Sequence, residues 1–423
     1  MAVLDAEVAF AGNDAETARR RAEAVLGSPS AAAELRCHAF ELLGRVARLT
    51  DLDAARAAFD QALSTADAAG LTVWRMRALH ELGTVEMFDH AGTGRLAEAR
   101  AAASELGALS TAAILDVQLT ATFIMRFALD DAVRHARAAL AMSERLGLAH
   151  IRPLALVFLG EIHALRQEPV QMERFLTLAT AAAPGDAEIE GSAWAGARAM
   201  IALLGDDRAA ALVAMDRGIA ILTAGGQQSP APYRGMWPVL LACAADPRAA
   251  AEIEQARRSG VTVNRANRGL LGYADAVLAG RRGERRRATD AAAAADPDLV
   301  HSPVWAELTR LWVAECATAD GWGDPAGWRH DAGECFAAHG LDKLAARARE
   351  PAGGSRPSRW AELGITAREA DVLVLVAEGL ANKQIAARLH LSARTVEKHV
   401  ESLLRRTGAR SRTQLVAIAG WQR

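Results

Sequence analysis

The chain has 423 residues, 51% of them hydrophobic and 24% charged, which is enough for more than one packed domain. Its formal net charge of −2 gives the chain as a whole no attraction for nucleic acid. Four scattered cysteines without a C-x-x-C pair exclude a disulfide framework, and no apolar run reaches the roughly 18 residues of a membrane-spanning helix.

Residues 1–349 are dominated by alanine, leucine and arginine, and no period-two run of Val, Ile and Thr indicates a strand. Glycine, proline or aspartate breaks recur about every 35 to 40 residues, a spacing typical of two-helix repeats. Small residues let paired helices approach closely, while larger ones fill the space between stacked hairpins.

The tetratricopeptide spacing of small and large residues is matched at Gly160, Met172, Leu176, Ala179 and Pro184, and with a one-residue slip at Gly44, Ala55, Phe59 and Ala62, with partial matches at Gly83 and at Ala132, Ala136 and Ala139. We therefore predict a degenerate tetratricopeptide-like helical-repeat solenoid over residues 1–349, which would sense or bind a partner. An irregular helical bundle is the alternative.

Two features of the later repeats have two interpretations each. Trp305, Trp312, Trp322 and Trp328 indicate either a well-packed cap or an aromatic cluster that binds a ligand. The basic run at residues 281–287 indicates either a solvated helix end or a second contact with DNA. In both cases the packing or solvated interpretation is favoured.

Motifs for catalysis are missing from the sequence. It has no H-E-x-x-H, no G-x-S-x-G and no glycine followed by lysine as in a phosphate-binding loop, and its eleven histidines lack ligand spacing. The acidic residues are assigned to helix surfaces at charge-pair spacing. We expect no enzymatic activity, no cofactor and no metal site.

A Pro/Gly/Ser-rich linker is predicted at residues 350–358, before a C-terminal domain at residues 359–423. From Arg359 onward the chain has eleven Lys and Arg against six Asp and Glu, a balance of +5, which leaves −7 for the remainder. This asymmetry is typical of an acidic body that carries a basic nucleic-acid-binding module.

The C-terminal domain shows four short helical patterns. Thr366 and Glu369 form a capping box at the start of the first, and the second begins near Asn382. Ser392 is the predicted N-cap of a third helix over residues 393–407, and Ser411 opens the fourth. Two short helices joined by a tight turn and flanked by supporting helices indicate a helix-turn-helix. The predicted fold is all-α: a helical-repeat solenoid followed by a four-helix helix-turn-helix domain.

The third helix has two distinct faces at about 100° per residue. Its apolar face holds Val396, Val400, Leu403 and Leu404, and its polar face holds Arg394, Lys398, Glu401, Ser402 and Arg405. A slim polar face with arginine and lysine is what a helix needs to enter the major groove.

The run from Glu369 to Val400, EADVLVLVAEGLANKQIAARLHLSARTVEKHV, resembles the LuxR-type (LuxR/FixJ) DNA-binding domain over roughly the last 60 residues. The resemblance implies binding to double-stranded DNA as a homodimer. With the helical wheel, it gives these candidate DNA-binding residues: Thr366, Asn382, Lys383, Ser392, Arg394, Thr395, Val396, Lys398, His399, Ser402, Arg405 and Arg410. It places the dimer surface at Thr413, Val416 and Ala417. Glu397 and Glu401 depart from the family, in which cations are frequent there; a carboxylate repels phosphate or accepts from a cytosine amine.

The whole layout resembles the C-terminal part of the large ATP-dependent LuxR (MalT-like) regulators without their ATPase domain. We expect either a natural short form or a piece of a longer chain. The resemblance implies a bacterial, cytoplasmic, nucleoid-associated transcriptional regulator that binds specific DNA sequences, with a protein or small-molecule effector at the helical repeats and no membrane partner. The alternative is an interaction scaffold whose helix-turn-helix has weak or lost DNA binding.

Overall fold

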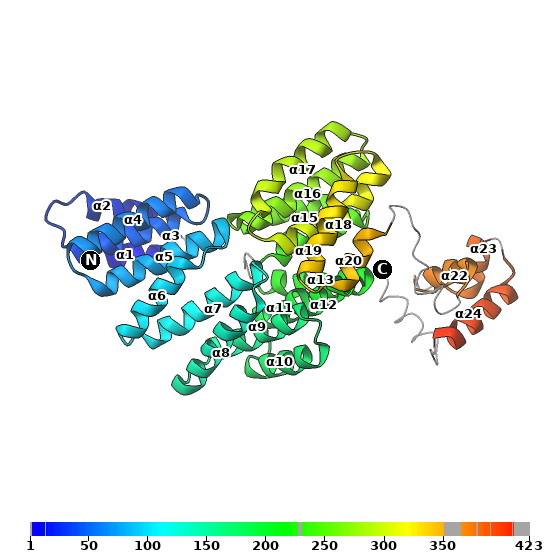
Figure 1. Cartoon of the computed structure of the whole chain (residues 1–423), viewed down its shortest axis with the longest axis horizontal. Helices are drawn as coiled ribbons and strands as arrows, with labels where there is room; N and C mark the ends of the chain where they lie inside the picture. The colour runs from blue at the N-terminus through cyan, green and yellow to red at the C-terminus, as the bar shows by residue number, and fades with distance from the viewer. Residues whose placement is uncertain are drawn as a thin grey trace.

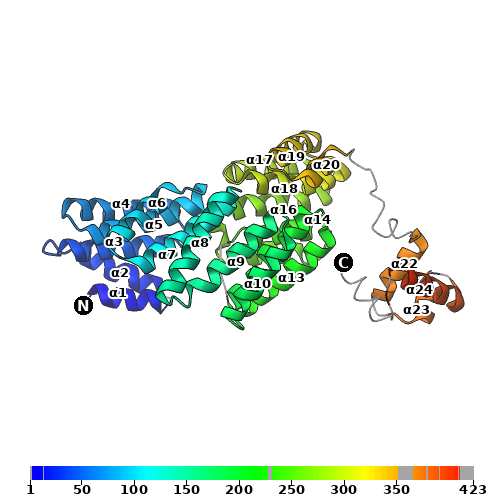
Figure 2. The same ribbon diagram turned by 60° about the horizontal axis from the view of Figure 1, so that its bottom comes forward.

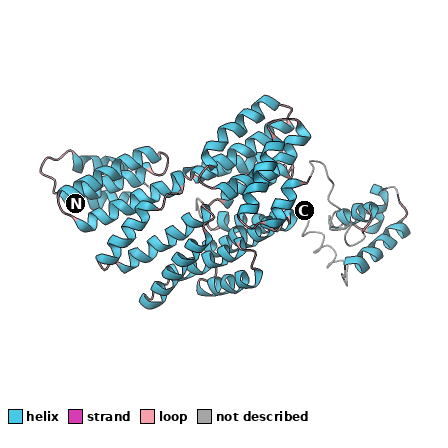
Figure 3. Ribbon diagram, in the orientation of Figure 1, coloured by secondary structure: helices cyan, strands magenta, loops and turns pink. Residues whose placement is uncertain are grey.

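The computed structural model describes residues 2–12, 14–226, 231–350, 365–377, 380–389, 391–407 and 409. Within these ranges every regular element is a helix, and no strand occurs among them (Figure 3). The predicted all-α class is therefore confirmed. Among the described helices, none is both long enough and apolar enough to cross a membrane.

Residues 2–350 form an array of consecutive helical hairpins (Figure 1). Its helices are α1 (Ala2–Ala11), α2 (Ala15–Leu26), α3 (Ala33–Ala47), α4 (Leu52–Ala68), α5 (Thr72–His90), α6 (Gly94–Glu105), α7 (Leu109–Met125), α8 (Leu129–Leu146), α9 (Ile151–Leu165), α10 (Pro169–Ala182), α11 (Ala187–Ser192), the π-helical turn η1 (Ala193–Arg198), α12 (Ala199–Leu204), α13 (Arg208–Ala224), α14 (Tyr233–Cys243), α15 (Ala249–Arg258), the 3₁₀ turn η2 (Val261–Val263), α16 (Arg265–Arg281), α17 (Arg285–Leu299), α18 (Pro303–Asp320), α19 (Pro325–Ala338) and α20 (Asp342–Arg349).

The turns inside the hairpins recur with a regular period. Ala91, Phe127, Gln167, Asp206 and Ala245 each follow the first helix of a pair and have φ between 51° and 61°, and they lie 36 to 40 residues apart. Left-handed backbone is unfavourable for residues with a Cβ, so the hairpin must supply compensation. After Phe127, the amide of residue 128 donates to the carbonyl of Phe123 at 2.9 Å, which is the closing bond of a Schellman motif. The structure thus repeats one hairpin unit; its assignment to the tetratricopeptide class stays a prediction.

Small residues meet large ones inside several hairpins, as the spacing predicted. A Cβ built at Gly44 of α3 would lie 2.3 Å from Cε1 of Phe59 in α4, and one at Gly160 of α9 would lie 2.5 Å from Cδ2 of Leu176 in α10. Phe59 and Leu176 are both 0% exposed. The paired helices can approach this closely only because the facing position has no side chain.

Several carboxylates are buried, so the prediction that acidic residues lie on helix surfaces is wrong for them. Glu41 of α3 and Glu81 of α5 are 2% and 6% exposed. Arg45 bridges them, with a 2.7 Å contact to each carboxylate. Asp116 of α7 is 1% exposed and pairs with Arg100 at 2.6 Å. These arginines neutralise acids that close helix packing removes from water.

The array curves so that late helices contact early ones (Figures 1 and 2). Trp305 of α18 donates from Nε1 to the carbonyl of Ile124 in α7 at 3.3 Å, across 181 residues of sequence. Arg265 at the start of α16 lies 3.4 Å from Asp89 of α5. The inner face of the early hairpins is thereby covered by the later ones.

The tryptophans of the later repeats are mainly packing residues, as favoured from the sequence. Trp312 and Trp322 are 1% and 4% exposed. Gly280 of α16 lies directly beneath Trp322, since a Cβ there would be 2.1 Å from Nε1. Trp322 and Trp328 pack edge to face with ring centroids 5.7 Å apart. Trp305 differs from these three, because it also lines a cavity between the early and late helices.

The basic run at residues 281–287 spans the turn between α16 and α17. Arg281 donates to the carbonyl of Cys243 at 2.8 Å, and Arg285 donates to the carbonyl of Asp320 at 3.1 Å. These bonds are typical of a helix-end turn held against neighbouring helices. A second DNA contact at this run stays an untested prediction.

The C-terminal domain has its own core, formed by α22 (Ala367–Ala377), α23 (Asn382–Leu389) and α24 (Ala393–Thr407). The predicted bounds of the third helix are confirmed. The core residues are Ile365, Val372, Leu373, Leu375, Val376, Ile385, Ala386, Val396, Val400, Leu403 and Ala409. Residues 351–358 of the linker predicted at 350–358, and the predicted fourth helix from Ser411, lie outside the described residues.

The contact between Gly44 and Phe59 gives a stability prediction. Gly44→Ala should lower the free energy of unfolding by about 1–3 kcal/mol, because its methyl group overpacks the buried ring. Gly94→Ala is the matched control, because a Cβ at Gly94 meets no atom within 4 Å. Urea denaturation followed by circular dichroism measures both; equal midpoints for the two variants would contradict the close approach.

Candidate nucleic-acid interface

Glu369 joins the first and third helices of the C-terminal domain. The Thr366 amide donates to its Oε2 at 2.8 Å, and the Glu369 amide donates back to the Thr366 hydroxyl at 3.3 Å, so the predicted capping box is confirmed. Arg406 of α24 lies 3.7 Å from the other carboxylate oxygen. Helix α24 is therefore anchored against the start of α22 by a charged contact.

The pKa of Glu369 lies below the ordinary value for a glutamate. Burial by itself would raise the pKa, but hydrogen bonds from Ser402 and Thr366, together with the charge of Arg406, outweigh it. The carboxylate is ionised at neutral pH and holds the ends of two helices together.

The turn between α23 and α24 is fixed by hydrogen bonds from both sides. Arg368 of α22 donates to the carbonyl of Leu389, the last residue of α23, at 2.5 Å. The hydroxyl of Ser392 accepts from the amide of Thr395 at 3.0 Å, which confirms Ser392 as the N-cap of α24. These contacts set the angle between the two helices of the helix-turn-helix (Figure 1).

Helix α24 presents a cationic face away from the domain core. Arg394, Lys398 and Arg405 are exposed, and none of them forms an ion pair with another described residue. At about 100° per residue they lie opposite the buried side chains of Val396 and Leu403. The chain therefore holds three cations on this face without neutralising them internally.

Two exposed carboxylates accompany these cations. By the helical wheel, Glu401 lies on the same face as Lys398 and Arg405, whereas Glu397 lies on its flank. The face keeps an excess of positive charge, but Glu401 stands within it. A DNA site that fits this face must place something other than phosphate near Glu401, such as the amine of a cytosine.

Val396 is a correction to the predicted DNA contacts. Its side chain is 0% exposed and packs in the domain core, so it cannot reach a base. Ser402 is half-buried; Arg406 donates to its hydroxyl at 3.2 Å, and that hydroxyl also bonds Glu369. Val396 helps to pack α24 in the domain core, and Ser402 holds α24 against α22 from the edge of the polar face; a DNA contact by Ser402 stays a prediction.

The other predicted contacts are placed as follows. Thr366, Lys383 and Ser392 are exposed, while Asn382, Thr395 and His399 are half-buried. The hydroxyls of Ser392 and Thr395 lie 2.7 Å apart at the start of α24, close in sequence to Arg394. Arg410 and the predicted dimer residues Thr413, Val416 and Ala417 lie outside the described residues.

Comparison with known proteins finds a match to this domain. Residues 364–419 match the family model described as bacterial regulatory proteins, luxR family. The chain is 53% identical over 58 residues to response regulator Rre1 of Synechocystis sp., covering 14% of this chain and 25% of that protein. It is 44% identical over 66 residues to response regulator RamR of Streptomyces coelicolor, covering 15% of this chain and 33% of the relative.

A putative HTH-type transcriptional regulator of Mycobacterium bovis is 50% identical over 62 residues, covering 14% of this chain and 7% of that protein. The chain thus spans about a quarter of the length of the Synechocystis relative and a still smaller share of the mycobacterial one. The similarity to each relative named above is confined to 14% or 15% of this chain and does not extend over its helical repeats.

The low pKa of Glu369 gives a pH prediction. Because folding lowers this pKa, the ionised carboxylate stabilises the domain fully at pH values above 4.5, the ordinary pKa of glutamate. This stabilisation is lost as the pH falls through the pKa of the folded state. Glu369→Gln should therefore weaken the domain by about 1 kcal/mol at pH 7, and the difference from wild type should shrink below pH 4.5. Hydrogen exchange of α22 and α24 measures the effect.

Asp371→Asn is the control for Glu369→Gln, because Asp371 is exposed on the same helix and pairs only at 3.3 Å with Arg368. It should leave the protection of α24 unchanged. Equal exchange rates in α24 for Glu369→Gln and wild type at pH 7 would show that the carboxylate does not hold the two helices.

Proposed function

We propose that this chain, whose residues 364–419 form a luxR-family helix-turn-helix domain, is a transcriptional regulator that binds specific double-stranded DNA sequences. The observation that carries the proposal is the exposed face of Arg394, Lys398 and Arg405 on a helix whose other face is packed. The short turn held by Ser392 orients that helix outward. Entry of such a helix into the major groove places its cations near phosphates and guanine edges.

DNA binding is proposed to occur as a homodimer. One recognition helix contacts only a few base pairs, and a two-fold dimer doubles the site by reading inverted half-sites. Thr413, Val416 and Ala417 remain the proposed dimer residues, by resemblance to the family. Function on chromosomal DNA would place the protein in the bacterial cytoplasm, associated with the nucleoid.

The helical array is proposed to sense a protein or small-molecule effector and to act by binding, without catalysis. Its support is architectural: curved arrays of helical hairpins offer an inner surface to partners, and here that surface is partly covered by later helices. Effector binding between early and late hairpins would change their packing and so influence the DNA-binding domain.

A second candidate function is an interaction scaffold whose helix-turn-helix binds DNA weakly. The observation in its favour is the exposure of Glu397 and Glu401 on the helix that would enter the groove. Each carboxylate facing phosphate opposes binding, so the two functions differ in the measured affinity for DNA and in its dependence on salt.

Lys398→Ala tests the regulator function. If Lys398 contacts a base, the substitution should weaken binding to the selected site by about 1–3 kcal/mol and leave binding to random duplex nearly unchanged. Fluorescence anisotropy on DNA fragments selected from genomic pools, over a range of salt concentrations, measures both affinities and the slope against salt.

Lys343→Ala is the matched control, because it removes an exposed lysine from α20 in the helical array. Glu401→Gln should strengthen binding to random duplex, since it removes a negative charge from the cationic face. Absence of DNA binding by the wild-type chain at low salt, restored by Glu401→Gln, would favour the scaffold function over the regulator.

A further inference from the structure

A cavity of about 220 Å³ lies inside the helical array, between the early hairpins and the later helices that cover them. Its walls come from α5, α7, α9, the α11–η1–α12 helix, the start of α14, and α18. An engineered apolar protein cavity of about 150 Å³ accepts benzene, so this volume suits an aromatic ring with a short substituent.

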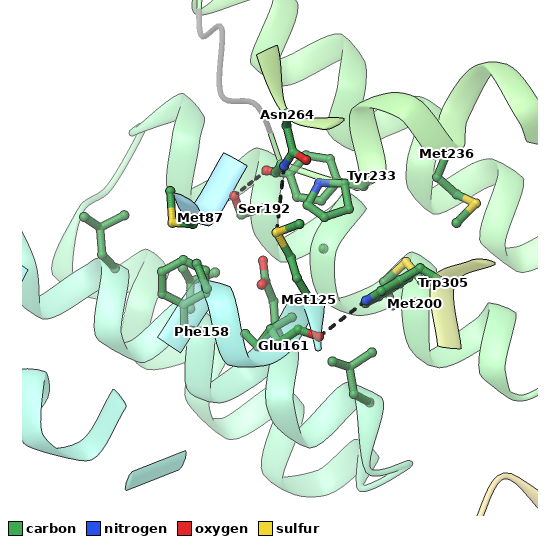
Figure 4. Close-up of a pocket in the computed structure, with 18 of the residues that line it drawn as sticks. Met87, Met125, Phe158, Glu161, Ser192, Met200, Tyr233, Met236, Asn264 and Trp305 are labelled. Atoms are coloured by element: carbon green, nitrogen blue, oxygen red, sulfur yellow. Dashed lines mark hydrogen bonds between the residues drawn. The ribbon is translucent and has the colours of Figure 1, made fainter. Parts of the chain in front are cut away.

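The cavity walls consist mainly of apolar side chains, several of them flexible or polarizable. They include Met125, Phe158, Met200, Tyr233 and Trp305, and Figure 4 shows these side chains around a common space. Methionine and aromatic side chains adapt to the shape of small apolar ligands. Aromatic faces also attract cations that have lost their water.

Most polar groups in the walls already have partners. The hydroxyls of Ser192 and Tyr233 lie 3.0 Å apart, and Trp305 donates to the carbonyl of Ile124 (Figure 4). Asn264 accepts from the amide of Ala266 at 3.1 Å. The first two bonds join different helices around the cavity, and the third caps α16, so these groups leave little polar chemistry for an occupant.

Glu161 is the one buried acid among the described residues that line the cavity. Its side chain comes from α9, is 7% exposed, and points into the cavity between Phe158 and Met200 (Figure 4). Among the described residues it forms no hydrogen bond and no ion pair. A buried carboxyl without a partner is costly, so a fold that keeps one gains from a ligand that completes it.

The backbone facing Glu161 is built to accommodate its carboxyl group. A Cβ at Gly196 would lie 2.1 Å from Oε1 of Glu161, so a larger residue there would displace the carboxyl group from its present position. Gly196 lies in η1, the π-helical turn that interrupts the α11–α12 helix. Such turns widen a helix locally and often occur at ligand sites.

The charge of the lining selects the class of ligand. Glu188 is a second carboxylate in the walls, and none of the lining residues is a lysine, arginine or histidine. An anionic ligand would lie against two acids with no cation to pair with, and a neutral ligand would leave Glu161 a buried protonated acid without an ionic partner, whereas a cation allows Glu161 to ionise and pair. We propose that this cavity binds a small apolar molecule carrying one protonated amine, with the Glu161 carboxylate as its counter-ion. A regulatory effect of this ligand would rest on the proposed sensor function of the helical array, but binding of the ligand can be measured without DNA.

Proton release accompanies this binding. Burial raises the pKa of Glu161 to about 8, so the empty site holds a protonated acid at pH 7. The titratable groups that face it are Glu188 and Tyr233, neither of them basic. An alkylamine, with a pKa near the value of about 10 for lysine, enters as an ammonium ion. Formation of the ion pair breaks the O–H bond of Glu161 and releases its proton to water.

The test uses the full chain and three probes that share a phenylethyl group: 2-phenylethylamine and 2-phenylethanol, which are nearly equal in size, and the somewhat larger 3-phenylpropionate. Isothermal titration at pH 7 should show the amine binding at least tenfold more tightly than the alcohol, and no binding of the carboxylate. Titration in two buffers of different ionisation enthalpy should show release of nearly one proton with the amine and none with the alcohol. Above pH 8 the release should fall toward zero.

Glu161→Gln keeps the size of the side chain and removes its charge. It should reduce amine binding to the level of the alcohol and leave alcohol binding unchanged, while Glu105→Gln, an exposed residue of α6, should change neither. Equal affinity for amine and alcohol in the wild-type chain, or binding of the amine without proton release at pH 7, would overturn the assignment even if the variant failed to fold.

The same protein preparations are assayed for DNA binding. Loss of the amine preference with DNA binding intact would refute the cavity ligand alone. Amine binding in a chain that never binds DNA would refute the regulator function and leave the cavity assignment standing.

Discussion

The structure of the helical array depends on positions where one helix of a pair has no side chain. Gly44 admits Phe59 and Gly160 admits Leu176, so each hairpin closes to a distance at which its large side chains are fully buried. Because the same unit recurs along the chain, small offsets between hairpins accumulate into curvature, and the curvature brings α18 onto α7. Gly196 likewise leaves space for a side chain of the facing helix, but that side chain is the carboxyl group of Glu161 and not an apolar group. The same absence of a side chain therefore occurs both in the ordinary core and beside the buried acid of the cavity.

Two buried glutamates show how their surroundings decide the state of the same side chain. Glu369 receives hydrogen bonds from Thr366 and Ser402 and lies near Arg406, so its pKa falls and it remains charged. Glu161 has no such donors among the described residues, and burial alone raises its pKa to about 8. The carboxylate of Glu369 has its partners within the domain and stabilises it. The carboxyl group of Glu161 has no partner among the described residues and is free to pair with a ligand. That contrast separates a structural acid from a candidate ligand-binding one.

The DNA-binding domain and the helical array have opposite electrostatic characters. The array buries several acids and pairs most of these with arginine, as Arg45 does for Glu41 and Glu81. Helix α24 keeps Arg394, Lys398 and Arg405 exposed and without ion pairs among the described residues. Charges that are not neutralised internally are available to phosphate, and the exposed Glu401 lowers the positive charge of the same face.

The sequence by itself determined every feature that depends on neighbours in the chain. The capping box of Thr366 and Glu369, the N-cap at Ser392, the bounds of α24 and the small and large residues of the hairpins follow from local hydrogen bonding and helical periodicity. The wheel of α24 also placed Val396 in the core, although it had been included among the DNA contacts. Only the tertiary structure decided which acids are buried without a partner. The apolar helix around Glu161 indicates burial, but whether another helix supplies a partner for its carboxyl group depends on how the hairpins pack. The cavity likewise required contacts across 181 residues, such as Trp305 with Ile124, and these arise from accumulated curvature that no local pattern encodes.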